Sequence, residues 1–418
     1  MRRAVVLGVL GVLSGCATTG GSVATAPPAP PDAGAAAAPT EAAQRAALEA
    51  LFDREAGPSP MQQVTVGEVT LSLESSTPVE VRREEAAQAT VLQLGLGSSQ
   101  PVRCTLFDHP IDPGGTLFKT LEALKARVQV QPRRPLDIEL VEKAPAIFLD
   151  LLYQVQRDGQ ALRGEYQLML HADDGAPLLC EHDEPGYQQA FRRVAAGVAA
   201  AVSRAGPRLP RDAFRWVDLL SIQGRPVGFV RALWLKQKGG GARTLTSTTL
   251  LVPRTASDWL ANDEVSVIEV GKDGGVLEKR QVNASNGTPE LDLTLTRVRR
   301  GVYAYRGTSQ GKALSGQLTT SDRKDVPGDP LQARMLADFT ASTRKALRLE
   351  DYLPAASPVA WTAVVTTHGA GPREVTIAAG PMTFQATLDA NGLTERASLP
   401  LGPVTMDQQR AFTEGTPW

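Results

Sequence analysis

The sequence predicts an α+β protein in two parts: a first part in which strands and helices alternate, and a second, mostly antiparallel β half-barrel with one main helix. In the first part the apolar residues switch between a period of two, typical of half-buried strands, and a helical period near 3.6. In the second part, strand-like segments follow one another between turns such as "GGGA" and "KDGG". The string "SRAGPRLPRD" fits neither pattern and marks a boundary between the parts.

The first part, over residues 61–205, is predicted to run in the order strands, helix, strands, helix. Alternating apolar residues predict strands at residues 64–73, 92–96, 147–155 and 162–170. One helical face is formed by Phe118, Leu121, Leu124 and Val128. A last strand in "PLLCEH" leads into a helix with the apolar residues Tyr187, Phe191, Val194 and Val198.

This order, closing with "LLCEHDEPGYQQAFRRVAAGVAAAV", resembles the PsbP-like and DcrB-like sandwich of small exported lipoproteins. The resemblance implies an N-terminal α/β sandwich of PsbP-like type. It implies no particular chemistry, because members of such a superfamily share a fold rather than an activity.

The second part, over residues 209–418, is predicted to be a long antiparallel sheet. Strands are expected at residues 214–222, 227–238, 243–252, 265–270, 276–282, 291–298, 302–306 and 313–319. A helix follows, with Asp329 as N-cap, Pro330 at its first position, and Leu331, Met335 and Phe339 on one face. Four further strands are expected after it. The strings "VGF", "LDANGL" and "LPLGPVTMDQQR" resemble the LolA/LppX-like half-barrel of lipid and lipoprotein carriers, including the sheet domain that accompanies some transglutaminase-like proteins.

The N-terminal residues predict export and lipidation. Arg2 and Arg3 precede an apolar run over residues 4–13, which together indicate a signal peptide over residues 1–15. The string "LSGC" resembles the lipobox of bacterial lipoproteins, so Cys16 is expected to be acylated and to become the mature N-terminus. Ala17, where an aspartate would imply inner-membrane retention, favours the outer membrane. Residues 16–60 then form the lipidated cysteine and an Ala/Pro-rich tether.

Charge and cysteine content narrow the partners and the compartment. Lys and Arg number 44 and Asp and Glu 45, so no strong positive field favours nucleic acid. Besides Cys16, the chain has only Cys104 and Cys180. In an oxidising compartment this pair is expected to form a disulfide.

The candidate ligand site is an apolar groove in the second part. Three residues of one strand share a face, and the helix adds two more; the set is Phe229, Leu233, Leu235, Met335 and Phe339. No cofactor, metal or catalytic residue is expected. The string "GTSQG" fits a hydrolase motif but lies between alternating segments, so it predicts a hairpin turn. The histidines His109, His171 and His182 show no tight ligand spacing.

These observations predict a non-enzymatic lipoprotein anchored in the outer membrane, with its folded body in the periplasm or at the cell surface. Its half-barrel is expected to bind an apolar ligand, such as a lipid or lipoprotein, or a partner protein. The alternative is a structural or accessory subunit of an envelope complex, without a ligand cavity.

Overall fold

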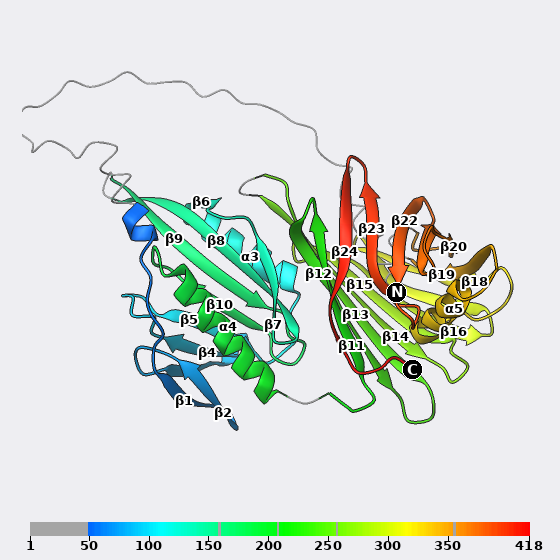
Figure 1. Ribbon diagram of the computed structural model, residues 1–418, viewed down its shortest axis with the longest axis horizontal. Coiled ribbons are helices and arrows are strands. Elements are labelled where there is room, and N and C mark those ends of the chain that lie inside the picture. Colours follow the sequence, from blue (N-terminus) through cyan, green and yellow to red (C-terminus); the bar gives the residue numbers. More distant parts are fainter. Residues whose placement is uncertain (1–48, 158–159, 207–208, 256–257, 354–356) are drawn as a thin grey trace, which may run out of the picture.

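A computed structural model describes residues 49–157, 160–206, 209–255, 258–353 and 357–418. The predicted signal peptide, Cys16 and most of the tether lie outside these residues. Among the described residues, no helix has the length and apolar character needed to cross a membrane. Figure 1 shows two β-rich bodies, which we call the N-terminal unit (residues 61–205) and the C-terminal unit (residues 209–418).

The N-terminal unit is built on an eight-stranded antiparallel sheet. A separate hairpin consists of β1 (Met61–Val66) and β2 (Val69–Glu74). The sheet strands are β3 (Glu80–Glu84), β4 (Ala89–Leu94), β5 (Val102–Phe107), β6 (Gln129–Pro132), β7 (Asp137–Val141), β8 (Ala144–Arg157), β9 (Gln160–His171) and β10 (Leu178–His182). Their order is β3-β4-β5-β10-β9-β8-β6, and β7 also pairs with β8.

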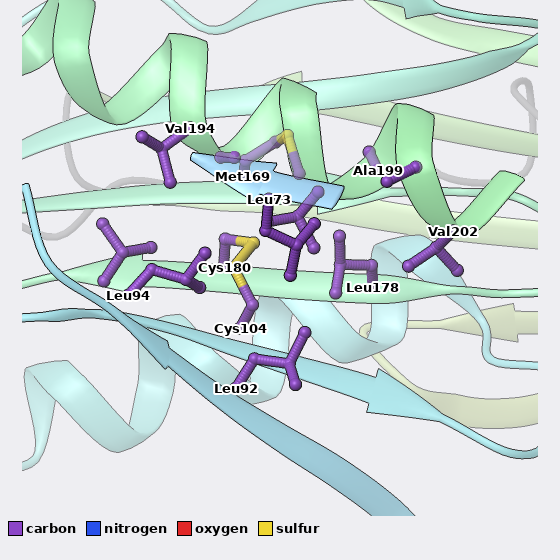
Figure 2. Packing of buried hydrophobic residues seen from close by; sticks show 14 of the residues in the cluster. Leu73, Leu92, Leu94, Cys104, Met169, Leu178, Cys180, Val194, Ala199 and Val202 are labelled. Carbon is purple, nitrogen blue, oxygen red and sulfur yellow. A yellow bond between two sulfur atoms is a disulfide. The ribbon is translucent and has the colours of Figure 1, made fainter. Parts of the chain in front are cut away.

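Two helices cover opposite faces of this sheet. Helix α4 (Gln188–Ala205) presents apolar residues at helical spacing and buries them against one face, together with the β1–β2 hairpin. Figure 2 shows Val194 and Val202 of this helix above Leu178 of the sheet. Helix α3 (Pro113–Lys125) begins with proline at its first position and packs Leu117 and Leu121 on the other face.

The predicted disulfide is confirmed, because Cys104 and Cys180 are bonded to each other. Cys104 lies in β5 and Cys180 in β10, where the two residues are direct partners in the antiparallel register. Both are fully buried, and Figure 2 shows the bond beneath α4 among Leu92, Leu94 and other apolar side chains. The bond therefore links two neighbouring strands in the centre of the core of the N-terminal unit.

The C-terminal unit is one fourteen-stranded antiparallel sheet with a helix between its two halves. The first half consists of β11 (Phe214–Ile222), β12 (Arg225–Lys236), β13 (Ala242–Pro253), β14 (Trp259–Val270), β15 (Val276–Ser285), β16 (Thr288–Arg299), β17 (Val302–Ser309) and β18 (Lys312–Thr319). Helix α5 (Asp329–Thr340) follows. The second half consists of β19 (Ala346–Asp351), β20 (Thr362–His368), β21 (Glu374–Ala379), β22 (Met382–Leu388), β23 (Thr394–Leu401) and β24 (Val404–Glu414).

The chain returns on itself, because β24 pairs with β11 and so joins the second half to the start of the first. The end strands of the sheet are β18 and β19. Hydrogen bonds connect the two halves near these end strands. The Ser321 N–H, just after β18, donates to Glu350 Oε2 in β19 at 2.8 Å. Lys279 Nζ, in β15, donates to the Tyr352 carbonyl just after β19 at 2.6 Å. The sheet is therefore curled, and we call its face toward α5 the inner face.

The two units are joined through α3. Leu117 and Leu121 of this helix lie in one buried cluster with Phe229, Leu251 and Trp259 of the C-terminal unit. The outer face of β12 to β14 therefore serves as part of the core that covers the sheet of the N-terminal unit.

A polar contact adds to this interface. Asp263 of β14 accepts hydrogen bonds from the backbone N–H groups of Gly114 (3.0 Å) and Gly115 (2.7 Å), at the first turn of α3. Asp112, the N-cap residue of α3, makes no capping bond with its own side chain. A residue 149 positions away in sequence thus supplies the cap.

The predicted fold class is wrong. The chain is mostly antiparallel β rather than an α+β protein with a PsbP-like sandwich: in the described residues 24 strands accompany three α-helices of twelve residues or more. The helical segments were identified, but each lies singly on a sheet face and they do not form a helical layer. The second half of the large sheet also holds six strands where four were expected.

Candidate functional site

The five residues predicted to line a ligand groove do not lie on one face of the sheet. Phe229 is fully buried on the outer face of β12, against α3 of the N-terminal unit. Leu233, four residues on, lines a cleft on the same face, and the alternation of the strand places Leu235 there too. Phe339 belongs to the cluster on the inner face, and Met335 packs against that cluster. The structure therefore separates the strand residues from the helix residues.

A register shift explains part of this difference. The pairing of β11 with β12 shifts between Leu220 and Ser221, which leaves Val227 as an extra residue in β12. Val227 consequently lies in the inner cluster, although Phe229 two residues later faces outward. A strict period of two predicts the same face for both residues, and it fails at the bulge.

Helix α5 covers the inner face of the second half of the sheet. Leu336 and Phe339 are buried among apolar side chains of β20 to β24. The ring of His368 in β20 stacks on Phe339, with 4.3 Å between ring centroids. Beside α5, Trp216, Trp234 and Leu336 border a cavity of about 50 Å³. This volume holds a few water molecules and no acyl chain.

Part of the inner face of the first half is polar, between the apolar clusters around Val230 and around Ile268. Across β13, β14 and β15 the register places Thr246 opposite Ser266 and Ser266 opposite Gln281. We call the buried group around them the inner polar patch; it consists of Thr244, Thr246, Thr248, Glu264, Ser266, Lys279 and Gln281. This patch is an unfavourable surface for a hydrocarbon chain, because polar groups in contact with the chain cannot form hydrogen bonds with water.

Two ionisable groups of the inner polar patch have specific partners. Glu264 Oε1 accepts a hydrogen bond from Gln281 Nε2 at 3.1 Å. Burial raises the pKa of Glu264 to about 8, while the nearby ammonium of Lys279 acts in the opposite direction. Lys279 lies 3.4 Å from Asp351 Oδ1 and donates to the Tyr352 carbonyl. These contacts tie β15 to the end of β19, so they stabilise the curled sheet.

A second buried acidic group lies in the N-terminal unit. Asp150 of β8 and Glu165 of β9 share the face that α4 covers. Glu165 accepts from Arg133 and from the Gly186 backbone N–H at 2.8 Å. Burial, and then the neighbouring Glu165, raise the pKa of Asp150 to about 8.

The pair of acids can hold one proton at neutral pH, since two adjacent buried carboxylates do not both ionise. Both carboxyl oxygens of Asp150 are buried away from solvent. Asp150 also lies at the wall of a pocket of about 320 Å³ beside the first turn of α4. Its carboxylate is 3.7 Å from the Arg134 guanidinium and 3.9 Å from that of Arg133. We interpret the pair of acids as part of the structural core beneath α4.

This pair predicts a pH-dependent stability. The pKa of Asp150 is about 8 in the folded protein and about 4 in an unfolded chain. The folded state therefore binds the proton more tightly, and the stability that this provides is present below pH 4 and is lost as the pH rises towards 8. The free energy of unfolding should fall across this window by at most about 1.4 kcal/mol per pH unit for this group.

The Asp150→Asn variant tests this expectation, because an amide cannot lose the proton. Urea unfolding between pH 4 and 9 should show a smaller slope for the variant than for the wild type. Asp292→Asn is the control, since that carboxylate is exposed on β16 and paired with Arg280. Equal slopes in all three proteins would exclude a raised pKa at Asp150.

The other sequence candidates do not come together as a site. His109 stacks edge-on with Phe107, His171 is buried with its Nε2 3.3 Å from the Val141 carbonyl, and His182 stacks on Phe191. In the described part of the chain, no group of three or more His, Cys, Asp or Glu residues is placed to hold a metal ion.

The hydrolase-like string "GTSQG" is a hairpin, as predicted. Ser309 ends β17 and pairs with Lys312 at the start of β18. Gln310 and Gly311 have φ values of 49° and 73°, as a tight hairpin turn requires. The strand-to-helix turn that a hydrolase nucleophile needs is absent at this position.

Sequence reasoning missed the contact of Asp263 with α3. The residue lies within "ANDEV", where a carboxylate interrupts an otherwise apolar strand. A carboxylate at a buried strand position is costly unless it accepts hydrogen bonds. The position of Asp263 in an apolar strand therefore indicates that it has hydrogen-bond donors. Its partner could not be named, because Gly114 and Gly115 belong to the other unit.

Comparisons with known proteins add little. No family model matches the chain, and no curated protein matches it. One solved structure with similarity is the crystal structure of a beta-barrel-like protein of domain of unknown function DUF1849 from Brucella abortus. It is 12% identical, with a TM-score of 0.39, over 50% of this chain and 99% of that chain. A TM-score at this level assigns neither a family nor a function.

Proposed function

We propose that this chain is a non-enzymatic lipoprotein of the cell envelope, anchored in the outer membrane through Cys16, which acts as an accessory subunit by binding a partner protein. The folded body is held in the periplasm, or at the cell surface, by the Ala/Pro-rich tether. The accessory subunit is the second of the two functions that the sequence suggests, and the binding of a partner protein is one of the options of the first. The carrier of an apolar ligand is the competing function.

The observation that favours the accessory subunit is the position of α5. Phe339 is 1% exposed and lies with Leu336 among the apolar side chains of the inner face. The protein's own helix thus occupies the surface on which a carrier would seat a lipid. The inner polar patch is a second unfavourable surface for an acyl chain, since it contains Lys279 and Glu264.

The Cys16→Ser variant tests the anchor. Removing the thiol removes the attachment point of the acyl chains, so the variant should leave the membrane fraction and appear in the soluble envelope fraction. The wild type should stay with the outer membrane. If the variant fractionates with the outer membrane as the wild type does, Cys16 is not the anchor.

The released Cys16→Ser protein then separates the subunit from the carrier. Purified without detergent, it should contain no stoichiometric lipid by mass spectrometry and should not bind a fluorescent fatty acid saturably. A matched variant with Phe339→Ala in addition should bind benzene but still not the fluorescent fatty acid, because truncation of one phenyl ring leaves an apolar cavity of about benzene size under α5. Stoichiometric lipid in the Cys16→Ser protein would contradict the proposal and establish the carrier.

A further inference from the structure

A cleft of about 580 Å³ lies between the two units. The N-terminal unit contributes Lys143, residues 172–176 and Ser203 to its lining. The C-terminal unit contributes Arg215, Arg231 and Leu233 from β11 and β12. We call this space the interunit cleft. Its volume is in the range of small-molecule sites, which often lie between domains.

Two guanidinium groups lie on neighbouring strands at the C-terminal side of the interunit cleft. Val217 is the register partner of Arg231, and Arg215 is the partner of Leu233, so the two arginines are diagonal neighbours on one face. The side chain of Arg231 is only 12% exposed. Its Nε is buried and has no hydrogen-bond acceptor among the described residues. A buried donor without a partner is costly and calls for an acceptor.

The guanidinium groups keep donors in reserve. Arg231 uses Nη1 for the Ala172 carbonyl and for Asp174 Oδ1 at 2.8 Å. Arg215 uses Nε for Glu414 Oε2 at 2.6 Å. Each guanidinium carries five N–H groups in a planar fork, and no described residue accepts from Nη1 or Nη2 of Arg215 or from Nη2 of Arg231.

The carboxylates of the interunit cleft are already engaged. Glu414 accepts from Arg215 and from Lys143. Asp173 accepts from Ser203 Oγ at 2.7 Å and from the Gly175 N–H at 2.9 Å.

One basic side chain of the lining has no such partner. Arg211 lines the cleft and makes no ion pair with a described residue. Five basic and four acidic side chains line the cleft in all. Glu142 pairs with Arg204 and Asp174 with Arg231, so each of the four acidic side chains has a partner, whereas Arg211 has no ion pair with a described residue.

We infer that the interunit cleft binds a small ligand with a carboxylate or phosphate group, held by the forked N–H groups of Arg215 and Arg231. Planar guanidinium groups match both anions with paired hydrogen bonds. Leu233 supplies an apolar contact for the body of the ligand, which gives this residue a place in a binding site other than the predicted groove. The named ligand contacts all belong to the C-terminal unit, and residues 172–176 of the N-terminal unit line the opposite side of the cleft.

Calorimetric titration of the full chain in detergent tests this inference, with inorganic phosphate and succinate as probes at constant ionic strength. Saturable binding of phosphate alone identifies the phosphate class, and binding of succinate alone identifies the carboxylate class. Binding of both identifies a general anion site. Each of these results supports the inference.

The variants locate the site. Arg215→Gln should weaken the binding at least tenfold. Arg211→Gln should also weaken the binding, and this substitution of an exposed side chain should not disturb the fold. Arg225→Gln is the matched control, because Arg225 is an exposed residue of β12 outside the cleft, and its affinity should equal that of the wild type. The inference is overturned if neither probe binds saturably, or if Arg215→Gln binds as tightly as Arg225→Gln.

Discussion

Replacing Asp263 by alanine should lower the free energy of unfolding by about 2 to 4 kcal/mol. The carboxylate accepts from Gly114 N–H, Gly115 N–H and Thr249 Oγ1, the last at 2.8 Å. Alanine leaves these donors buried without an acceptor and removes a negative charge from the N-terminus of α3. The loss is partly offset because a costly buried carboxylate disappears; burial raises its pKa, while the three hydrogen bonds act in the opposite direction.

Urea unfolding followed by tryptophan fluorescence measures this loss, and hydrogen exchange shows where it acts. Amides in the first turn of α3 should exchange faster in Asp263→Ala than in the wild type. Asp263→Asn is the matched control: it keeps one acceptor oxygen and should lose less stability. A stability of Asp263→Ala within about 0.5 kcal/mol of the wild type would mean that the cap does not couple the two units.

The tightness of this interface explains why the substitution should be felt. A Cβ added at Gly115 would lie 3.0 Å from the Cα of Gly287, in the hairpin between β15 and β16. Gly287 and Asn286 both have positive φ, as a two-residue hairpin turn requires. Backbone therefore packs on backbone here, and water has little room to replace the lost carboxylate oxygens.

Local patterns in the sequence predicted the elements whose cause is local. The apolar spacing of Phe191, Val194 and Val198 predicted α4, and the "KDGG" and "NASNG" strings predicted turns that the structure contains. The disulfide followed from compartment and cysteine count. In each of these cases the information lies within a few residues or in the composition.

The predictions of the fold class and of the ligand groove were wrong because these features depend on contacts between residues that are distant in sequence. Alternation in β12 shows that one face is apolar, but it does not show what covers that face. Phe229 is covered by α3, a helix more than a hundred positions earlier in the chain, and the inner face is covered by α5. The pairing of β24 with β11 is equally distant in sequence. Long-range contacts of this kind leave no periodic signal in a single sequence.

The double variant Cys104→Ala/Cys180→Ala should lose about 4 to 5 kcal/mol of stability in the chain-entropy model of a crosslink. The bond joins residues 76 positions apart, so its removal frees a long loop in the unfolded chain. The native strands should change little, since β5 and β10 remain paired by their backbone ladder. The effect therefore falls on the unfolded state, and the dependence of the free energy of unfolding on urea should become steeper as that state expands.

Val102→Ala separates the crosslink from simple loss of packing. Val102 is buried in β5, two residues from Cys104 and in the same apolar cluster, but it forms no covalent bond. Truncating it should cost about 1 to 2 kcal/mol and leave the urea dependence unchanged. Thiol labelling of the denatured, unreduced wild type should detect neither Cys104 nor Cys180. A double variant no less stable than Val102→Ala, with the same urea dependence, would show that the bond contributes only the packing of its two sulfur atoms.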